Sequence, residues 1–330
     1  RLGAGFGSGE GMILSGSVSQ QNIFGSGKHV TLGLNTSKIN TTYSLSYTDP
    51  YYTVDGVSRG FDLYLREIDA AESGLGNYRT QSVGAAVRFG VPVTEIDTIN
   101  YGLGYEKTNI ATFADSPLIY LDYVRTFGSR NDAILATAGW TRDNRDSLIY
   151  PTKGTLQKAS LEVGLPGASL TYGRLQYQYQ QYFPITRDYT LMLNYEFGYG
   201  DGYGDTTTLP FFKNFYLGGV NSLRGFKTFT VGPKDIQGNP RGGNKKLLGN
   251  VEFLFPFPGL AGDRSARLSA FVDTGWTGQK LEFDELRASA GIGALWVSPL
   301  GPLKISIAVP FARQDDDKKQ IFQFTFGGAF

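Results

Sequence analysis

Residues 189–199 read YTLMLNYEFGY, and this stretch decides the fold. Large apolar or aromatic side chains occupy every second position, at Tyr189, Leu191, Leu193, Tyr195, Phe197 and Tyr199. The positions between them carry Thr190, Met192, Asn194, Glu196 and Gly198. A half-buried strand produces this alternation, whereas an amphipathic helix does not. Residues 303–311 and 321–330 repeat the pattern, so the chain is predicted to be all-β.

Turns interrupt the alternating runs at regular intervals. Seven clusters of turn residues lie at 25–27, 49–56, 92–97, 143–154, 184–188, 256–264 and 298–302. Eight further reversals lie near Gly9, Asn40, Gly74, Asp115, Gly167, Asp201, Gly278 and Asp316. These fifteen reversals separate sixteen strands of about 10 residues, the length that a tilted strand needs to cross the hydrocarbon of a membrane. A closed antiparallel barrel of the bacterial type requires an even number of strands.

The two faces of the strands indicate which side of the sheet meets lipid. A membrane barrel presents apolar side chains outward and polar ones to its lumen, the reverse of a soluble sandwich. Polar residues share one face at Arg174, Gln176, Gln178, Gln180, Arg267 and Asp273. Aromatic residues near strand ends, which fit interfacial girdles, are Tyr47, Tyr51, Tyr52, Phe183, Trp276 and Trp296. We therefore predict a single domain over residues 1–330, a 16-stranded antiparallel transmembrane β-barrel, in preference to a soluble sandwich.

Composition excludes several classes of function. The chain has 31 Lys and Arg against 30 Asp and Glu, so it lacks the basic excess of a nucleic-acid binder. It has no cysteine and one histidine, His29, so we expect no metal site, no cofactor and no catalytic pair. Residues 25–28, GSGK, lack the spacing of a phosphate-binding loop. The acidic run 315–317 precedes two lysines in a reversal and is expected to be solvated.

One interval is too long to be a turn. Residues 201–246 are rich in glycine and lack sustained alternation, and loops of this length are usually functional or disordered. The loop contains an Arg-Gly-aromatic turn formed by Leu223, Arg224, Gly225 and Phe226. If the loop folds into the lumen, Arg224 needs an acidic partner, because an unpaired buried charge is prohibitive. Glu252 and Asp273, inward-phased acids on the next two strands, are the candidate partners. A second long interval, 110–130, is expected to contain one or two helical turns.

The seam between the first and last strands is predicted to be the weakest in the barrel. Strand one, residues 1–8, alternates glycine, and the last strand, residues 319–330, has two glycines near its end. Glycine weakens strand pairing and permits bending. The residues of this seam are Gly3, Gly5, Gly7, Phe322, Phe324, Phe326, Gly327, Gly328 and Phe330.

Motifs spread over the whole chain resemble the barrel domain of the BamA family, the central subunits of the bacterial β-barrel assembly machinery. Residues 22–27, 49–56 and 150–154 are similar to periplasmic turns of that family. Residues 210–216 and 223–226 are similar to its lumenal sixth loop, although Leu223 stands where the family often has valine. Residues 296–303 and 322–324 are similar to its last strands. The POTRA domains that precede the barrel in this family are missing from the sequence, so we expect an excised barrel.

The resemblance implies a location in the outer membrane of a Gram-negative bacterium and a function as an insertase. Such a protein folds and inserts β-barrel proteins without ATP, through a lateral gate between its first and last strands, and catalyses no covalent step. The implied partners are nascent outer-membrane β-barrel proteins, the lipoproteins of the BAM complex (bound mainly through the POTRA domains) and outer-membrane lipids. No nucleic acid is expected to bind.

Other membrane barrels remain as alternatives. A translocation-assembly subunit or a two-partner secretion transporter also carries an Arg-Gly-aromatic loop, so this motif does not separate them, whereas residues 49–56 and the full-length match favour the BamA family. A passive porin would have an open lumen, which a plugging loop argues against. A barrel enzyme would need a catalytic pair, and none is defined around His29.

Overall fold

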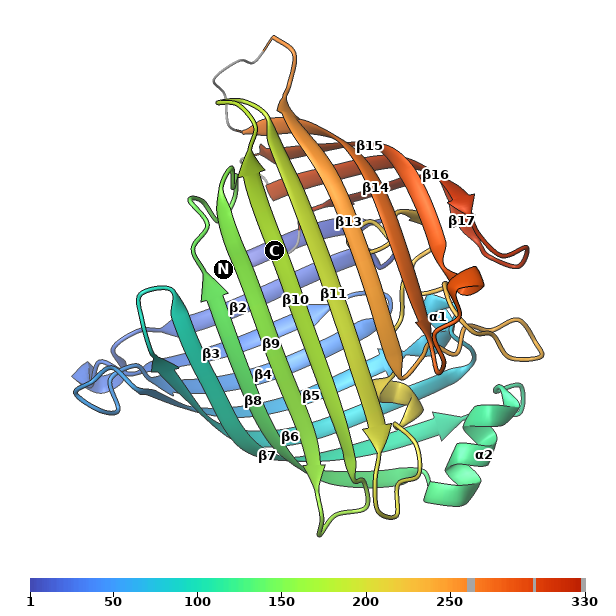
Figure 1. Cartoon of the computed structure of the whole chain (residues 1–330). Coiled ribbons are helices and arrows are strands. Elements are labelled where there is room, and N and C mark those ends of the chain that lie inside the picture. Colours follow the sequence, from blue (N-terminus) through green and yellow to red (C-terminus); the bar gives the residue numbers. More distant parts are fainter. Residues whose placement is uncertain (260–264, 299–300, 328–330) are drawn as a thin grey trace.

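The computed structural model describes residues 1–259, 265–298 and 301–327. Within these residues, sixteen antiparallel strands form one closed barrel, in the order β1-β18-β16-β15-β14-β13-β11-β10-β9-β8-β7-β6-β5-β4-β3-β2 (Figure 1). Their bounds are Leu2–Gly7 (β1), Gly11–Gln20 (β2), His29–Thr36 (β3), Asn40–Asp49 (β4), Ser58–Asp69 (β5), Tyr78–Pro92 (β6), Asp97–Thr112 (β7), Arg130–Asp143 (β8), Gly154–Leu165 (β9), Tyr172–Pro184 (β10), Thr190–Gly202 (β11), Lys245–Pro256 (β13), Ala266–Gly278 (β14), Arg287–Ser298 (β15), Gly301–Ala312 (β16) and Phe322–Phe326 (β18). The predicted fold class and strand number are confirmed.

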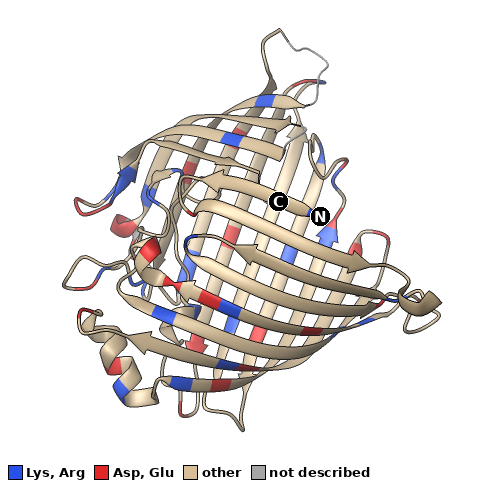
Figure 2. Ribbon diagram, turned by 180° about the vertical axis from the view of Figure 1, so that it is seen from behind, with Lys and Arg blue, Asp and Glu red and all other residues tan. Residues whose placement is uncertain are grey.

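The alternation of side chains sorts them between lumen and lipid as predicted. On β10 and β11, Gln178 lies opposite Glu196, and its neighbour Tyr179 lies opposite Tyr195. The amide of Gln178 donates to Asn194 (2.9 Å) on the lumenal face, whereas Tyr195 on the outer face is 49% exposed. Most of each strand carries neither acid nor base (Figure 2). The wall is therefore apolar outside and hydrogen-bonded inside, as a bilayer requires.

Two short strands lie outside the barrel wall. β12 (Gly225–Phe226) and β17 (Lys319–Gln320) pair with each other as a separate antiparallel sheet. The prediction of one continuous last strand over 319–330 is therefore wrong at its start, because residues 319–320 bind the long loop instead of the wall. The barrel part of that segment is the five-residue strand β18.

The longer connections gather at one end of the barrel. α1 (Ala70–Ser73), α2 (Leu118–Phe127) and the loop between β11 and β13 lie there together (Figure 1). α2 fulfils the expectation of helical turns in 110–130, and its Tyr120 stacks on Phe211 of the loop at 4.4 Å between ring centres. Short 3-10 turns form at Ile23–Gly25, Phe211–Lys213 and Phe283–Glu285. The end with short turns is periplasmic and the end with long loops extracellular by the usual rule for such barrels.

No helix in the described part of the chain is both long and apolar enough to cross a membrane.

Candidate functional site: the lumenal loop and the seam

The structure brings Arg224 of the long loop together with Glu252 on β13 and Asp273 on β14. Arg224 Nε and Nη2 each donate to a different oxygen of Asp273 (2.7 Å both), and Nη1 donates to Glu252 Oε1 (3.0 Å). The backbone N–H of Arg224 also donates to Asp273 (3.1 Å). This forked arrangement uses the planar guanidinium to bind a carboxylate at two points, which is stronger and more directional than a single ion pair.

The charged side chains of this cluster are shielded from solvent, so they depend on one another for compensation of charge. The side chain of Arg224 is 4% exposed and that of Asp273 is 0% exposed. The guanidinium carbon lies 3.2 Å from the centre of the Phe271 ring, which covers one of its faces. Burial alone would lower the pKa of Arg224, but the hydrogen bonds to Asp273 and the charge of Glu252 outweigh burial and raise the pKa. Removal of Arg224 would leave both carboxylates buried without the cation that pairs with them.

The turn that follows Arg224 is bound to the last barrel strand by Gln323. The side-chain amide of Gln323 accepts from the backbone N–H of Gly225 (3.1 Å) and donates to the carbonyl of Phe226 (2.7 Å). Gln323 is fully buried. Gly225 has φ +85°, and a Cβ there would lie 3.0 Å from the carbonyl oxygen of Ala308, so glycine is required at this position.

Gln323 is a residue to which sequence reasoning gave no role. Its place in the alternation, between the outward-facing Phe322 and Phe324, marks it as lumenal, but nothing in the sequence shows which backbone lies opposite. Ser289 on β15 was missed in the same way, and its hydroxyl donates to the carbonyl of Arg224 (2.6 Å). Both residues anchor the loop through its backbone, which leaves no signature in the side chains of the loop.

Apolar packing holds the same loop inside the barrel. Leu223 and Phe226, on either side of the Arg-Gly pair, are both fully buried. They form one cluster with Leu217 and Val231 of the loop and Leu248 of β13. The Arg-Gly-aromatic turn is therefore fixed by charge on one side and by apolar contact on both flanks.

The loop also contacts the hairpin that leads into the last strand. Lys234 Nζ lies 2.8 Å from Asp316 and 3.9 Å from Asp317. Arg287 Nε donates to Asp317 (3.1 Å), whose side chain is 0% exposed. The expectation that the acidic run 315–317 is solvated is therefore wrong for Asp317, which balances buried cations. The hydrogen bond from Lys234 lowers the pKa of the more exposed Asp316.

Up to Gly327, where the described part of the last strand ends, the seam between β1 and β18 has few contacts. Two residue pairs of this part are in register, Phe6 with Phe326 and Gly7 with Thr325. One further backbone bond runs from Ser8 N–H to the carbonyl of Phe324 (2.9 Å). By contrast β18 pairs with β16 over five residues, and β6 pairs with β7 over fifteen.

The remaining seam residues divide into two groups. Gly3 and Gly5 pair with β2 and have no registered partner on β18 among the residues that the structure describes. Phe324 stacks on Phe6 at 5.8 Å on the outer face. Gly327 follows β18 with φ +63°. Gly328 and Phe330 lie outside the described residues.

In residues 1–259, 265–298 and 301–327, no group of three or more acidic or histidine side chains could hold a metal ion.

These features define a class: a membrane-spanning β-barrel whose lumen holds its own long loop and whose first and last strands, as far as the structure describes them, share two registered residue pairs. Residues 22–330 match the model of the Omp85 superfamily domain, and the chain belongs to this superfamily. Members of this family in bacteria are outer-membrane proteins, and the chain is a bacterial outer-membrane barrel.

Several relatives are outer membrane protein assembly factors. The chain is 38% identical to BamA of Neisseria meningitidis, over 100% of this chain and 46% of that protein. It is 26% identical to BamA of Nitratidesulfovibrio vulgaris, over 96% of this chain and 40% of that protein. The chain thus spans about half the length of the curated relatives that it matches.

Solved structures agree with this assignment. The crystal structure of Haemophilus ducreyi BamA lacking POTRA domains 1–3 superposes with a TM-score of 0.93 at 27% identity, covering 100% of this chain and 69% of that chain. CdiB from Acinetobacter baumannii superposes with a TM-score of 0.64 at 13% identity, covering 99% of this chain and 59% of that chain. The second likeness shows a shared fold alone.

Proposed function

We propose that this barrel folds and inserts β-barrel proteins into the outer membrane by opening laterally between β1 and β18. The observation that carries the proposal is the seam, because within the described residues, which end at Gly327, two registered residue pairs join β1 to β18 where other neighbouring strands share five to fifteen. The assembly-factor relatives support the same role. No covalent step and no nucleotide are part of the proposal.

The mechanism follows from backbone hydrogen bonding. Opening of the seam breaks few bonds but exposes the N–H and C=O groups of β1, and unpaired backbone groups in lipid are costly. A client strand that pairs with this edge removes the cost by β-augmentation. The free energy of client pairing therefore drives insertion, and ATP is not needed.

The loop supplies the support against which the seam moves. Arg224 fixes the turn to β13 and β14, and Gln323 ties the same turn to β18. β18 is consequently bound to the loop as well as to β16. The hydrogen bonds of the Gln323 side chain go to the loop and not to β1. We infer that β1 is the edge that is released, while the loop positions β18.

The proposed partners follow from the same mechanism. Unfolded outer-membrane β-barrel proteins would supply the pairing strand, and outer-membrane lipids would surround the open edge. Accessory lipoproteins of the BAM complex would bind the wider protein mainly outside this barrel.

A disulfide across the seam tests the proposal directly, because the chain has no native cysteine. A Cβ built at Gly7 lies 3.8 Å from Cβ of Thr325, within the range for a disulfide. The pair Gly7→Cys and Thr325→Cys is introduced into the full-length protein in a strain depleted of its own copy. Growth and assembly of a reporter barrel are expected to fail when the pair is oxidised and to recover with reductant.

The matched control locks β1 to its other neighbour. Gly3 lies opposite Ser15 on β2, so Gly3→Cys with Ser15→Cys crosslinks β1 without closing the seam. This control is expected to support growth whether oxidised or reduced. Normal assembly by the Gly7→Cys, Thr325→Cys protein with its disulfide fully formed would refute lateral opening and favour a scaffold or pore function.

A further inference from the structure

An arginine faces outward from the barrel wall near its periplasmic end. On β5 the side chain of Tyr64 points into the lumen, where its hydroxyl donates to Glu106 (2.5 Å), so the odd-numbered positions of this strand face lipid. Arg59 is one of them. Its guanidinium carbon lies 4.0 Å from the centre of the Tyr52 ring and 5.5 Å from that of Phe61. Aromatic rings at this level are typical of the membrane–water interface.

The charge of Arg59 is not balanced by the protein. Asp49 lies directly opposite on β4, but its carboxylate lies 3.5 Å from Lys28. Arg59 forms no ion pair with the described residues, and its Nε is buried without a hydrogen-bond partner. Two cations and one carboxylate therefore leave one excess positive charge at the interface, the level at which anionic lipid headgroups lie.

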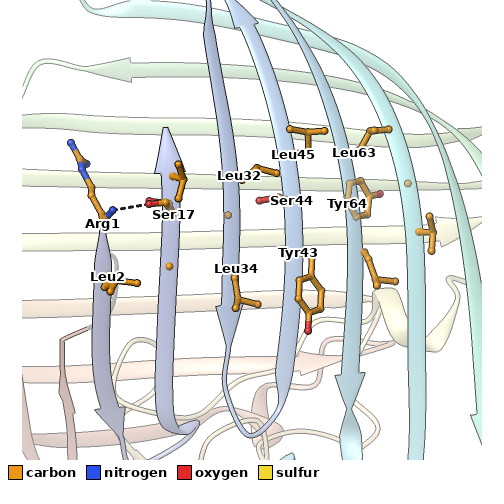
Figure 3. Close-up of a pocket in the computed structure, with 16 residues that line it drawn as sticks. Arg1, Leu2, Ser17, Leu32, Leu34, Tyr43, Ser44, Leu45, Leu63 and Tyr64 are labelled. Carbon is orange, nitrogen blue, oxygen red and sulfur yellow. Dashed lines mark hydrogen bonds between the residues drawn. The ribbon is translucent and has the colours of Figure 1, made fainter. Parts of the chain in front are cut away.

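An apolar hollow of about 860 Å³ begins farther along the same outer face, next to the seam. Leu2, Leu32, Leu34, Tyr43, Leu45 and Leu63 line it from β1, β3, β4 and β5 (Figure 3). These side chains share the outward face of their strands. Leu2 is 95% and Leu63 53% exposed, so the described residues leave both side chains largely uncovered.

The distance between Arg59 and the hollow matches the distance between the headgroup and the acyl-chain end of a phospholipid. Leu63 and Leu65, which both line the hollow, lie four and six positions along β5 from Arg59, and six positions of a strand extend about 20 Å. A strand tilted by about 45° converts this to about 14 Å along the membrane normal, close to half of a hydrocarbon core about 30 Å thick. The cationic end lies at the headgroup level and the apolar end near the bilayer centre.

We propose that this outer face, from Arg59 on β5 to the hollow beside the seam, is a binding site for one phospholipid of the periplasmic leaflet. The guanidinium of Arg59 can bind two phosphate oxygens at once, and Lys28 balances Asp49, so the charge of Arg59 is left for the phosphate. The headgroup phosphate binds at Arg59 over the Tyr52 ring, and an acyl chain lies in the hollow. This site is independent of the insertase proposal, because it requires only that the barrel spans a bilayer.

Native mass spectrometry of the chain released from detergent micelles tests the site. The probes are phosphatidylglycerol, diacylglycerol, which lacks the phosphate, and inorganic phosphate, which lacks the acyl chain. Phosphatidylglycerol is expected to remain bound at one copy per barrel, with at least fivefold less diacylglycerol and no retained phosphate ion. Equal retention of diacylglycerol, retention of phosphate alone, or lipid-free dimers that cover the hollow would each overturn the proposal.

Four variants separate the headgroup from the chain. Arg59→Gln is expected to reduce bound phosphatidylglycerol at least fivefold and Arg59→Lys to reduce it less. Arg142→Gln is the matched control, because Arg142 lies at the same end with Asp97 as its partner (3.7 Å) and should leave binding unchanged. Gly16→Trp fills the hollow from β2 and is expected to reduce binding as well. Folding of each variant is verified by heat-modifiable gel mobility, and unchanged lipid binding by folded Arg59→Gln would refute the site.

Discussion

Arg224 carries its charge into a part of the lumen where its side chain is only 4% exposed. Two carboxylates, one ring face and one serine hydroxyl surround it, so every polar edge has a partner. Such a cluster adds little net stability over an apolar core of the same shape, but it tolerates no partial loss. The main effect of the cluster is therefore to fix the position of the loop in the lumen.

Arg224→Ala is expected to release the loop, because Asp273 then remains fully buried without a cation. Loss of one partner of a buried pair costs about 3–5 kcal/mol. Limited proteolysis of residues 203–244 in the folded barrel measures this, and we expect cleavage there in the variant but not in the parent. Lys227→Ala is the control, since it removes an exposed cation three residues away. An equally resistant Arg224→Ala loop would contradict this account of the ion pairs.

At this scale, side-chain phase and the two carboxylate partners of Arg224 were predictable from the sequence, whereas contacts to the loop backbone were not. Alternation places Glu252 and Asp273 on the inner face of their strands, and the need of Arg224 for a carboxylate makes them candidates. Gln323 has the same inward phase but no charge that demands a partner. Its hydrogen bonds go to loop backbone, and the path of a glycine-rich loop depends on tertiary packing that no local pattern records.

Among the elements, β17 and β18 show how a single alternating run divides. Residues 319–326 read as one strand, yet the first two residues pair with β12 in the lumen and the last five join the wall. Both segments satisfy the same alternation, so the sequence contains no signal for the break. The structure thereby joins the long loop and the last strand into one unit.

Gln323→Leu tests this union, because it leaves the N–H of Gly225 and the carbonyl of Phe226 without partners. An unsatisfied buried group costs about 1–3 kcal/mol, which corresponds to hydrogen exchange at Gly225 that is faster by about 5-fold to about 160-fold. The amides of β18 are expected to exchange faster as well, while those of β6 and β7 stay unchanged. Gln323→Glu retains the acceptor for Gly225 and should show a smaller effect. Exchange confined to Gly225 would mean that loop and strand are not coupled.

For the whole molecule, the number of strands, their length and the polarity of their two faces were predictable from the sequence. Each of the sixteen strands follows the same rule, with apolar side chains toward lipid and polar ones toward the lumen. Closure was inferred from an even strand count, and the structure confirms it. The extent of pairing at the closing seam could not be inferred, since glycine content predicts a weak seam but sets no register.

The filled lumen predicts how the molecule conducts ions. Planar-bilayer recordings are expected to show small and unsteady conductance, because the loop between β11 and β13 places its 223–226 turn in the lumen. Deletion of 204–243 with a short glycine linker should raise the conductance severalfold. A large, steady conductance of the intact chain would instead support the passive-porin alternative.

The contact between Lys234 and Asp316 has a pharmacological consequence. Asp316 is 61% exposed and lies at the loop end of the barrel, which faces the cell exterior. It belongs to the hairpin that continues into β17 and β18. An antibody or cyclic peptide in the growth medium that binds this hairpin would therefore restrict the movement of β18 without crossing the outer membrane. The permeability barrier that keeps most drugs out of Gram-negative cells gives this hairpin no protection.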